Sequence, residues 1–158
     1  MGENCWLAPN ATLVGDVKLG KNCTVWFNAV IRGDVNEIRI GDDTNIQDGA
    51  VIHCTYKQAG TYIGNQVSIA HNAIVHGCII HDRVLVGMGA IVMDGAIVHS
   101  DAVIAAGAVA IVAKKAGKNG HFSSPCCAVT VACHGEETGG QPKYIRRLNC
   151  SGRRQADG

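Results

Sequence analysis

Three histidines with unequal spacing are the side chains of this sequence best suited to chemistry. His71 and His76 lie five residues apart in the segment VSIAHNAIVHGC, and His53 lies 23 residues before His76. Imidazole nitrogens are common zinc ligands, but a spacing of five suits neither one face of a helix nor one face of a strand. Whether the three rings meet therefore depends on the fold that carries them.

The composition favours one β-rich domain with many tight turns. Of 158 residues, 47% are hydrophobic, only 4% are aromatic and 20 are glycine. The net charge of +1 argues against an electrostatic reader of nucleic acid. No apolar run reaches the roughly 18 residues of a membrane span, and no leader opens the chain. We therefore expect a cytoplasmic protein that binds neither nucleic acid nor membrane.

The eight cysteines favour reduced thiols over a disulfide framework. Cys5, Cys23, Cys54 and Cys78 are widely separated and lie in otherwise regular segments. Without an export signal, free thiols are the expected state. The other four lie near the C-terminal end without the paired CxxC spacing of a zinc ribbon, which argues against a metal knuckle there. They are Cys126, Cys127, Cys133 and Cys150.

A six-residue period of apolar positions runs through most of the chain. Sixteen positions mark it, and of the fifteen steps between neighbours twelve span six residues and one spans five. The two longer steps, from Ile31 to Ile40 and from Ile52 to Ile63, indicate loop insertions of three and five residues. The marked positions are Leu13, Leu19, Val25, Ile31, Ile40, Ile46, Ile52, Ile63, Ile69, Val75, Ile80, Val86, Val92, Val98, Ile104 and Ala110.

This period predicts an all-β solenoid, a left-handed parallel β-helix of hexapeptide repeats with three short strands per coil of about 18 residues. Each inward aliphatic side chain would stabilise the stack by about 1.5–3 kcal/mol. An ordinary β-sandwich would give less even spacing. We expect the β-helix domain to span residues 1–111. Residues 112–158, where the period has stopped, are expected to form an irregular and poorly ordered C-terminal segment.

Counting along the coils assigns the marked positions to three faces. If Ile52 lies on face A, then Ile63 lies on face B, Ile69 on face C and Val75 on face A again. The 23 residues between His53 and His76 are one coil plus the five-residue insertion, so both rings should leave face A at the same corner. Adjacent coils lie about 4.8 Å apart, which is close enough for two imidazoles to share an ion.

His71 should lie on face C, around the corner from the other two histidines. A three-fold assembly that docks face C of one chain on face A of the next would bring His71 to the pair from a neighbouring subunit. Three histidines with an open fourth position are typical of catalytic zinc. The same counting stacks His81 on His99 on face B, but no third ligand accompanies that pair, which we interpret as exposed corner residues.

Polar residues surround the predicted positions of the three histidines. Arg32 follows Ile31 and should lie on face A one coil below His53. Asp34 comes two residues after Arg32. Gln47 and Asp48 follow Ile46 on face C, where Asp48 should lie beneath His71 and orient its ring. Taken singly, each of these residues would be interpreted as a solvated turn residue.

Together, these motifs resemble the gamma-class carbonic anhydrase family of hexapeptide-repeat proteins. The resemblance covers about residues 5–112, in the order RGD, NIQD, a histidine and HNAIVHGC. It implies a homotrimer that binds zinc or ferrous iron between subunits, with His53 and His76 from one chain and His71 from the next. The activity implied is the attack of a metal-bound hydroxide on carbon dioxide, the reaction of a carbonate dehydratase.

The resemblance also assigns roles to the polar residues. It implies that Arg32 and Asp34 form an ion pair between subunits, and that Gln47 positions the hydroxide or bicarbonate. Asn45 and Asp48 complete the NIQD motif and are expected to support the ligands or the subunit interface.

The chain departs from the best-studied branch of that family at its proton-shuttle glutamates. Val35 and Tyr56 occupy those positions, which implies weak hydration activity. Two alternatives remain open. One is a hexapeptide acyltransferase or thioesterase acting on an acyl-CoA, which would need only a single catalytic histidine. The other is a trimeric scaffold or accessory protein with a vestigial metal site.

Overall fold

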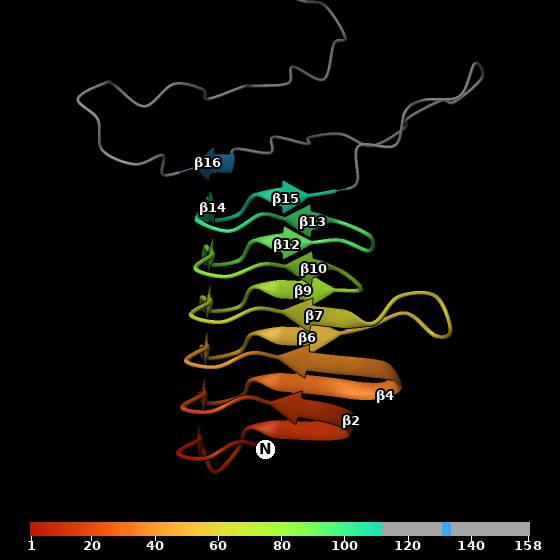
Figure 1. Ribbon diagram of the computed structural model, residues 1–158, viewed down its shortest axis with the longest axis vertical. Helices are drawn as coiled ribbons and strands as arrows, with labels where there is room; N and C mark the ends of the chain where they lie inside the picture. Colours follow the sequence, from red (N-terminus) through yellow and green to blue (C-terminus); the bar gives the residue numbers. More distant parts are fainter. Residues whose placement is uncertain (112–130, 134–158) are drawn as a thin grey trace, which may run out of the picture.

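The computed structural model describes residues 1–111 and 131–133, which form a solenoid of stacked coils (Figure 1). Within these ranges every element is a strand, and no helix is long and apolar enough to cross a membrane. Face C is a sheet of six parallel strands, one from each coil. They are β1 (Trp6–Leu7), β3 (Thr24–Val25), β5 (Asn45–Ile46), β8 (Ser68–Ile69), β11 (Leu85–Val86) and β14 (Ala102–Ile104). The predicted parallel solenoid of hexapeptide repeats is confirmed.

Faces A and B belong to a second sheet, because two long strands turn the corner between them. β2 (Thr12–Leu19) and β4 (Val30–Ile40) are the broad ribbons of the lower coils in Figure 1. Face A continues through β6 (Val51–His53), β9 (Ile74–His76), β12 (Ile91–Val92) and β15 (Val109–Ala110). Face B continues through β7 (Thr61–Ile63), β10 (Ile79–Ile80) and β13 (Ile97–Val98).

The core is a stack of the aliphatic side chains that mark the six-residue period. Fifteen of the sixteen are buried, and Leu13 is partly buried against them. On face A, Ile31, Ile52 and Val75 lie directly above one another in register. Because each buried side chain contacts its counterparts in the coils above and below, the period fixes the register of every coil.

The two insertions differ in structure. The first is a bulge within the continuous strand β4, not the loop that the sequence predicted: Gly15 pairs with Gly33, whereas Val17 pairs with Ile38. The extra residues stay within the strand because β2 and β4 remain paired on both sides of the bulge. The second insertion is a loop over residues 54–60, in which the Thr55 amide donates to the carbonyl of Ala59 at 2.9 Å.

The C-terminal side of face C is covered by a short antiparallel strand. β16 (Val131–Cys133) pairs with β14, opposite in direction to every other pairing in that sheet. Apart from β16, residues 112–158 lie outside the described residues. The predicted domain boundary at residue 111 and the predicted poor order of the segment after it therefore stay predictions.

Four of the cysteines are free thiols, as predicted. Cys23, Cys54 and Cys78 are buried, and Cys5 is partly buried. Desolvation raises the pKa of the Cys78 thiol to about 12, so this sulfur is an unreactive part of the core. The tail cysteines lie outside the described side chains.

Candidate metal centre

His53 and His76 face each other at one corner of successive coils. They are paired in the ladder between β6 and β9, and Nδ1 of His53 lies 3.0 Å from Nε2 of His76. The side chains are 15% and 32% exposed, so both rings lie partly at the surface of the solenoid. The predicted stacking of these two histidines is confirmed.

A carboxylate in the next coil holds His76. Oδ1 of Asp94 lies 2.6 Å from Nδ1 of His76, and the hydroxyl of Thr55 donates to Oδ2 of Asp94 at 2.8 Å. Desolvation opposes ionisation of Asp94, but the hydrogen bonds from His76 and Thr55 together lower the pKa of its carboxyl, which therefore stays ionised. Asp94 was not among the residues predicted for the site. The available signal was its position 18 residues, one coil, after His76.

Gly77 makes the approach of Asp94 possible. Its φ is +55°, and a Cβ built there would lie 2.0 Å from the Asp94 carboxylate oxygen. A side chain at this position would therefore displace the carboxylate that holds His76. The glycine in the motif HGC is thus a structural requirement of the histidine that precedes it.

His53 has an acidic partner and a basic neighbour. Its Nε2 lies 3.1 Å from Oδ1 of Asp34, and the Arg32 guanidinium lies 3.5 Å from its Nδ1. Desolvation works against ionisation of Asp34, but hydrogen bonds from Arg32 and His53 lower the pKa of its carboxyl. Within one chain Arg32 also pairs with Asp34 at 2.7 Å, so these residues form a network around His53. Their ion pair between subunits stays a prediction.

His71 lies at a different corner, as predicted. Its Nδ1 is 3.0 Å from Oδ2 of Asp48, and both side chains are nearly half exposed. This confirms that Asp48 lies beneath His71. Across the described residues, no three histidine, cysteine or acidic side chains of one chain are grouped so that they could hold a metal. His71 is therefore not grouped with His53 and His76 within the described part of one chain.

The remaining predicted residues are Asn45, in β5 of face C, and Gln47, which directly follows that strand. Gln47 is half-buried, and its side-chain amide makes no hydrogen bond to the described residues. Asn45 donates to the Thr24 hydroxyl at 2.7 Å and so ties two coils of face C together. Asn45 is accordingly a structural residue within the chain, whereas Gln47 remains available to a ligand.

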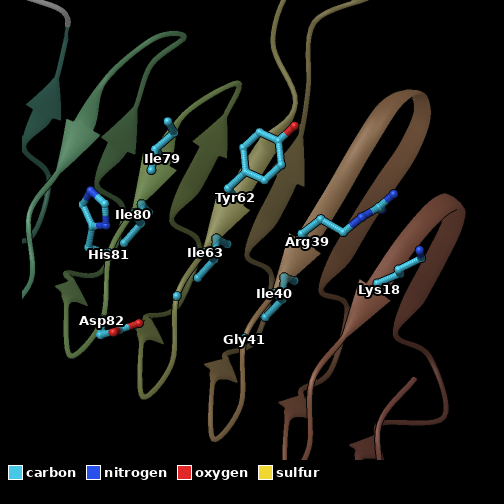
Figure 2. A pocket seen from close by; sticks show the side chains of 11 residues that line it. Lys18, Arg39, Ile40, Gly41, Tyr62, Ile63, Ile79, Ile80, His81 and Asp82 are labelled. Carbon is cyan, nitrogen blue, oxygen red and sulfur yellow. The ribbon is translucent and has the colours of Figure 1, made fainter.

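Face B carries a second histidine pair that serves as an internal comparison. His81 and His99 stack with ring centroids 5.6 Å apart and an interplanar angle of 7°, as the counting predicted. His81 borders a shallow hollow of about 370 Å³, shown in Figure 2, with Lys18, Arg39 and Tyr62 on successive strands. Arg39 is occupied by ion pairs with Asp16 and Glu37.

The donor set on face A fits a zinc or ferrous ion. The imidazoles of His53 and His76 lie in register. Each has a carboxylate beside the ring nitrogen that faces away from the other ring. Carboxylates placed behind histidines in this way fix the ring orientation and raise the basicity of the free nitrogen. Among the described residues, no carboxylate hydrogen bond is made to His81 or His99, so the two histidine pairs differ in their surroundings as well as in place.

The chain is similar to several known proteins. Residues 1–33 match the family model described as bacterial transferase hexapeptide (six repeats). The chain is 53% identical over 90 residues to a probable carbonic anhydrase of Methanocaldococcus jannaschii, covering 57% of this chain and 56% of that one. It is 39% identical over 112 residues to the mitochondrial gamma carbonic anhydrase 2 of Arabidopsis thaliana, covering 68% and 40%.

A solved structure with the same architecture is a hexapeptide transferase family protein from Anaplasma phagocytophilum. It superposes with a TM-score of 0.64 at 40% identity, covering 68% of this chain and 64% of that one. The chain thus spans about half the length of the curated relatives that it matches.

Proposed function

We propose that the protein is a metal-dependent carbonic anhydrase that hydrates carbon dioxide reversibly. The premise is that the part of the chain with the six-residue period belongs to the gamma-class carbonic anhydrase family of hexapeptide-repeat proteins. The observation that supports this most directly is the in-register pair of His53 and His76, each hydrogen-bonded to a carboxylate. A solenoid without a metal site has no need of this arrangement.

The metal would be zinc or ferrous iron, held by His53 and His76 of one subunit and by His71 of the next in a homotrimer. Such an ion lowers the pKa of a coordinated water towards about 7 and so supplies a nucleophile at neutral pH. His71 pairs with Asp48 at a different corner from His53 and His76, which supports assigning its imidazole to the site of a neighbouring subunit.

The residues of the chain prepare this site before any ion binds. Asp94 would accept a hydrogen bond from Nδ1–H of His76, which leaves the lone pair of Nε2 available to a metal ion. Thr55 fixes the second oxygen of Asp94, so the carboxylate cannot rotate away. Gln47, with its side-chain amide unpaired among the described residues, would hold an oxygen of bicarbonate.

Proton release would be the slow part of the cycle. Val35 packs against the hydrophobic core, and Tyr56 is 60% exposed with Lys57 over its ring. Neither side chain offers a carboxylate that could carry a proton to solvent near pH 7. We therefore expect hydration to be weak and to increase with the concentration of a small buffer that can accept protons.

Two alternatives give different results in the same measurements. An acyltransferase or thioesterase would act on an acyl-CoA without a metal, in line with the transferase family named for the similar solved structure. A scaffold with a vestigial site would form a trimer that binds metal and shows no hydration above background.

The test compares purified wild-type protein with His76→Ala and His99→Ala. We expect about one metal per wild-type chain, loss of metal and hydration in His76→Ala, and wild-type behaviour in His99→Ala, which removes a histidine from the other pair. Acyl-CoA turnover in metal-free protein would overturn the proposal. So would a metal-loaded wild type whose carbon dioxide hydration, followed by stopped flow, equals that of His76→Ala.

A further inference from the structure

Two cysteines are stacked on each other in the coil that carries the N-terminus and the coil above it (Figure 1). β1 and β3 pair in parallel with Trp6 opposite Thr24, so the residues before them, Cys5 and Cys23, lie in register. The Trp6 amide donates to the carbonyl of Cys23 at 2.9 Å, which continues the ladder through this pair. Cys23 is fully buried, and Cys5 is partly buried against the core.

The two thiols interact across the gap between the coils. Sγ of Cys5 donates to the carbonyl of Gly20 at 3.0 Å, and Sγ of Cys23 donates to the carbonyl of Gly41 at 3.0 Å. Gly20 lies in the turn that leads into β3, so the Cys5 sulfur already reaches the next coil. Desolvation raises the pKa of the Cys23 thiol, and the proximity of Cys5 raises it further.

The separation between the coils suits a disulfide bond. Residues paired across neighbouring parallel strands lie about 4.8 Å apart. This is within the roughly 4.4–6.8 Å between Cα atoms that a disulfide spans. The Cβ atoms of a disulfide lie slightly closer, so the first coil must move a little toward the second. Among the described residues β1 pairs only with β3, which leaves the first coil free to make that movement.

The coil itself does not require cysteine at these positions. In the next three coils the same column holds Thr44, Val67 and Val84, all of them buried. A small side chain of another kind therefore fills the column equally well. Two cysteines in succession point to the chemistry of sulfur and not to packing.

The other two cysteines whose side chains the structure describes serve as an internal comparison. The strand registers place Cys54 opposite Gly77 and Cys78 opposite Thr61. Both of these thiols are buried, and neither is stacked on a second cysteine within the described part of the chain.

We propose that Cys5 and Cys23 form a reversible disulfide site that is oxidised by a small-molecule disulfide such as oxidised glutathione. The thiolate of Cys5, the more accessible of the two, attacks the small disulfide, forms a mixed disulfide and expels one small thiolate. The Cys23 thiolate then attacks Sγ of Cys5 and expels the second small thiolate. The cysteine pair loses two electrons and two protons, and the small disulfide gains them as two thiols. This site is independent of the proposed function, because it involves none of the histidines.

The first experiment incubates the full chain with oxidised glutathione and maps cross-linked peptides by mass spectrometry. Competing thiols near the C-terminal end are first removed by Cys126→Ser, Cys127→Ser, Cys133→Ser and Cys150→Ser. We expect a mass about 2 Da lower, for the two hydrogens lost, and one cross-linked peptide that joins Cys5 to Cys23. A cross-link from Cys5 to any other cysteine, or glutathione that stays attached to Cys5, would overturn the proposal.

Two variants of this protein separate the two thiols. Cys23→Ser should trap glutathione on Cys5, because the thiol that would expel it is gone. This variant should fold, since the buried hydroxyl of Thr44 in the same column donates to the carbonyl of Gly64 at 3.0 Å. Cys54→Ser is the matched control, because it removes a buried thiol elsewhere, and it should form the cross-link as the parent does. Loss of the cross-link in Cys54→Ser, or no trapped glutathione in Cys23→Ser, would contradict the proposed site.

The second experiment measures what the disulfide does to the first coil. The amides of Trp6 and Ala8 donate to carbonyls of the second coil at 2.9 and 2.8 Å, so their hydrogen exchange reports on the separation of the two coils. Closing a loop of this length should slow their exchange by about 100-fold in the oxidised protein. The amide of Val51, which donates to a carbonyl several coils away, should exchange equally in both forms. Equal exchange of Trp6 and Ala8 in the oxidised and reduced protein would show that the cross-link does not fasten the coil.

Discussion

Replacing Asp94 should weaken metal binding in two graded steps. Asp94→Asn keeps the size of the side chain and an oxygen that can still accept from Nδ1 of His76, so it removes only the charge. Asp94→Ala also removes the hydrogen bond and leaves the Thr55 hydroxyl without its partner. The two variants therefore separate the electrostatic effect of the carboxylate from its positioning effect.

The expected magnitudes follow from the geometry. Partners placed behind metal-binding histidines contribute about 10–100-fold to metal affinity. The 2.6 Å contact to Asp94 is a short, charge-assisted hydrogen bond, and the second oxygen of Asp94 is held by Thr55. We expect a loss of about tenfold for Asp94→Asn and about 100-fold for Asp94→Ala, which correspond to about 1.4 and 2.8 kcal/mol.

The assay is competition for zinc against a chelating dye at fixed pH, with the oligomeric mass and the melting temperature measured on the same samples. Asp101→Asn is the control, because it makes the same change on a carboxylate paired with Arg83 at another corner. If Asp94→Ala bound zinc with wild-type affinity while remaining folded, the carboxylate would not position His76 and the reasoning would be wrong.

Three further changes test the core, the corners and the glycine after His76. Ile52→Ala should lower the free energy of unfolding in urea by about 2–5 kcal/mol, because the side chain is fully buried between two coils. The hydrogen bond from Arg83 lowers the pKa of Asp101, so the stabilisation by this pair is complete above the usual value of 3.8 and is lost as the pH falls through the folded-state pKa. The melting temperature of wild type should therefore fall more than that of Asp101→Asn on acidification to about pH 2. Gly77→Ala should reduce zinc affinity by at least about tenfold, because its Cβ would displace the Asp94 carboxylate.

These three changes have distinct controls and refuting outcomes. Gly89→Ala matches Gly77→Ala in backbone strain, with φ of +64°, but its Cβ would meet no atom within 4 Å, so it should keep zinc affinity. Equal zinc affinity in the two alanine variants would contradict the steric account. A loss below about 1 kcal/mol for Ile52→Ala would show that the stack tolerates cavities, contrary to expectation. Parallel acid profiles of wild type and Asp101→Asn would show that the ion pair adds no pH-dependent stability.

The register of the coil was predictable from the sequence because the inward positions accept only apolar side chains. Once Ile52 and Val75 are assigned to one column, the pairing of His53 with His76 follows from counting. The same reasoning placed Asp48 beneath His71. These predictions depend only on which residue lies above which in successive coils, and the six-residue period specifies that stacking directly.

What the sequence did not reveal depends on side-chain geometry and on local backbone shape. Counting places Asp94 one coil after His76, but it does not show that Gly77 opens a path for the carboxylate. The three-residue insertion in β4 was interpreted as a loop, since a bulge and a loop differ only in whether the flanking strands stay paired. Arg32 and Asp34 pair within the chain, a contact between near neighbours that a periodic pattern does not predict.

The loop over residues 54–60 has a consequence for engineering. The ladder between β6 and β9 holds His53 against His76 although this loop lies between them in the chain. Segments of other lengths can therefore be grafted after Thr55 to change the wall beside the site while both imidazoles stay where they are. The coil separates the part of the molecule that sets ligand positions from a part whose sequence is free to diversify.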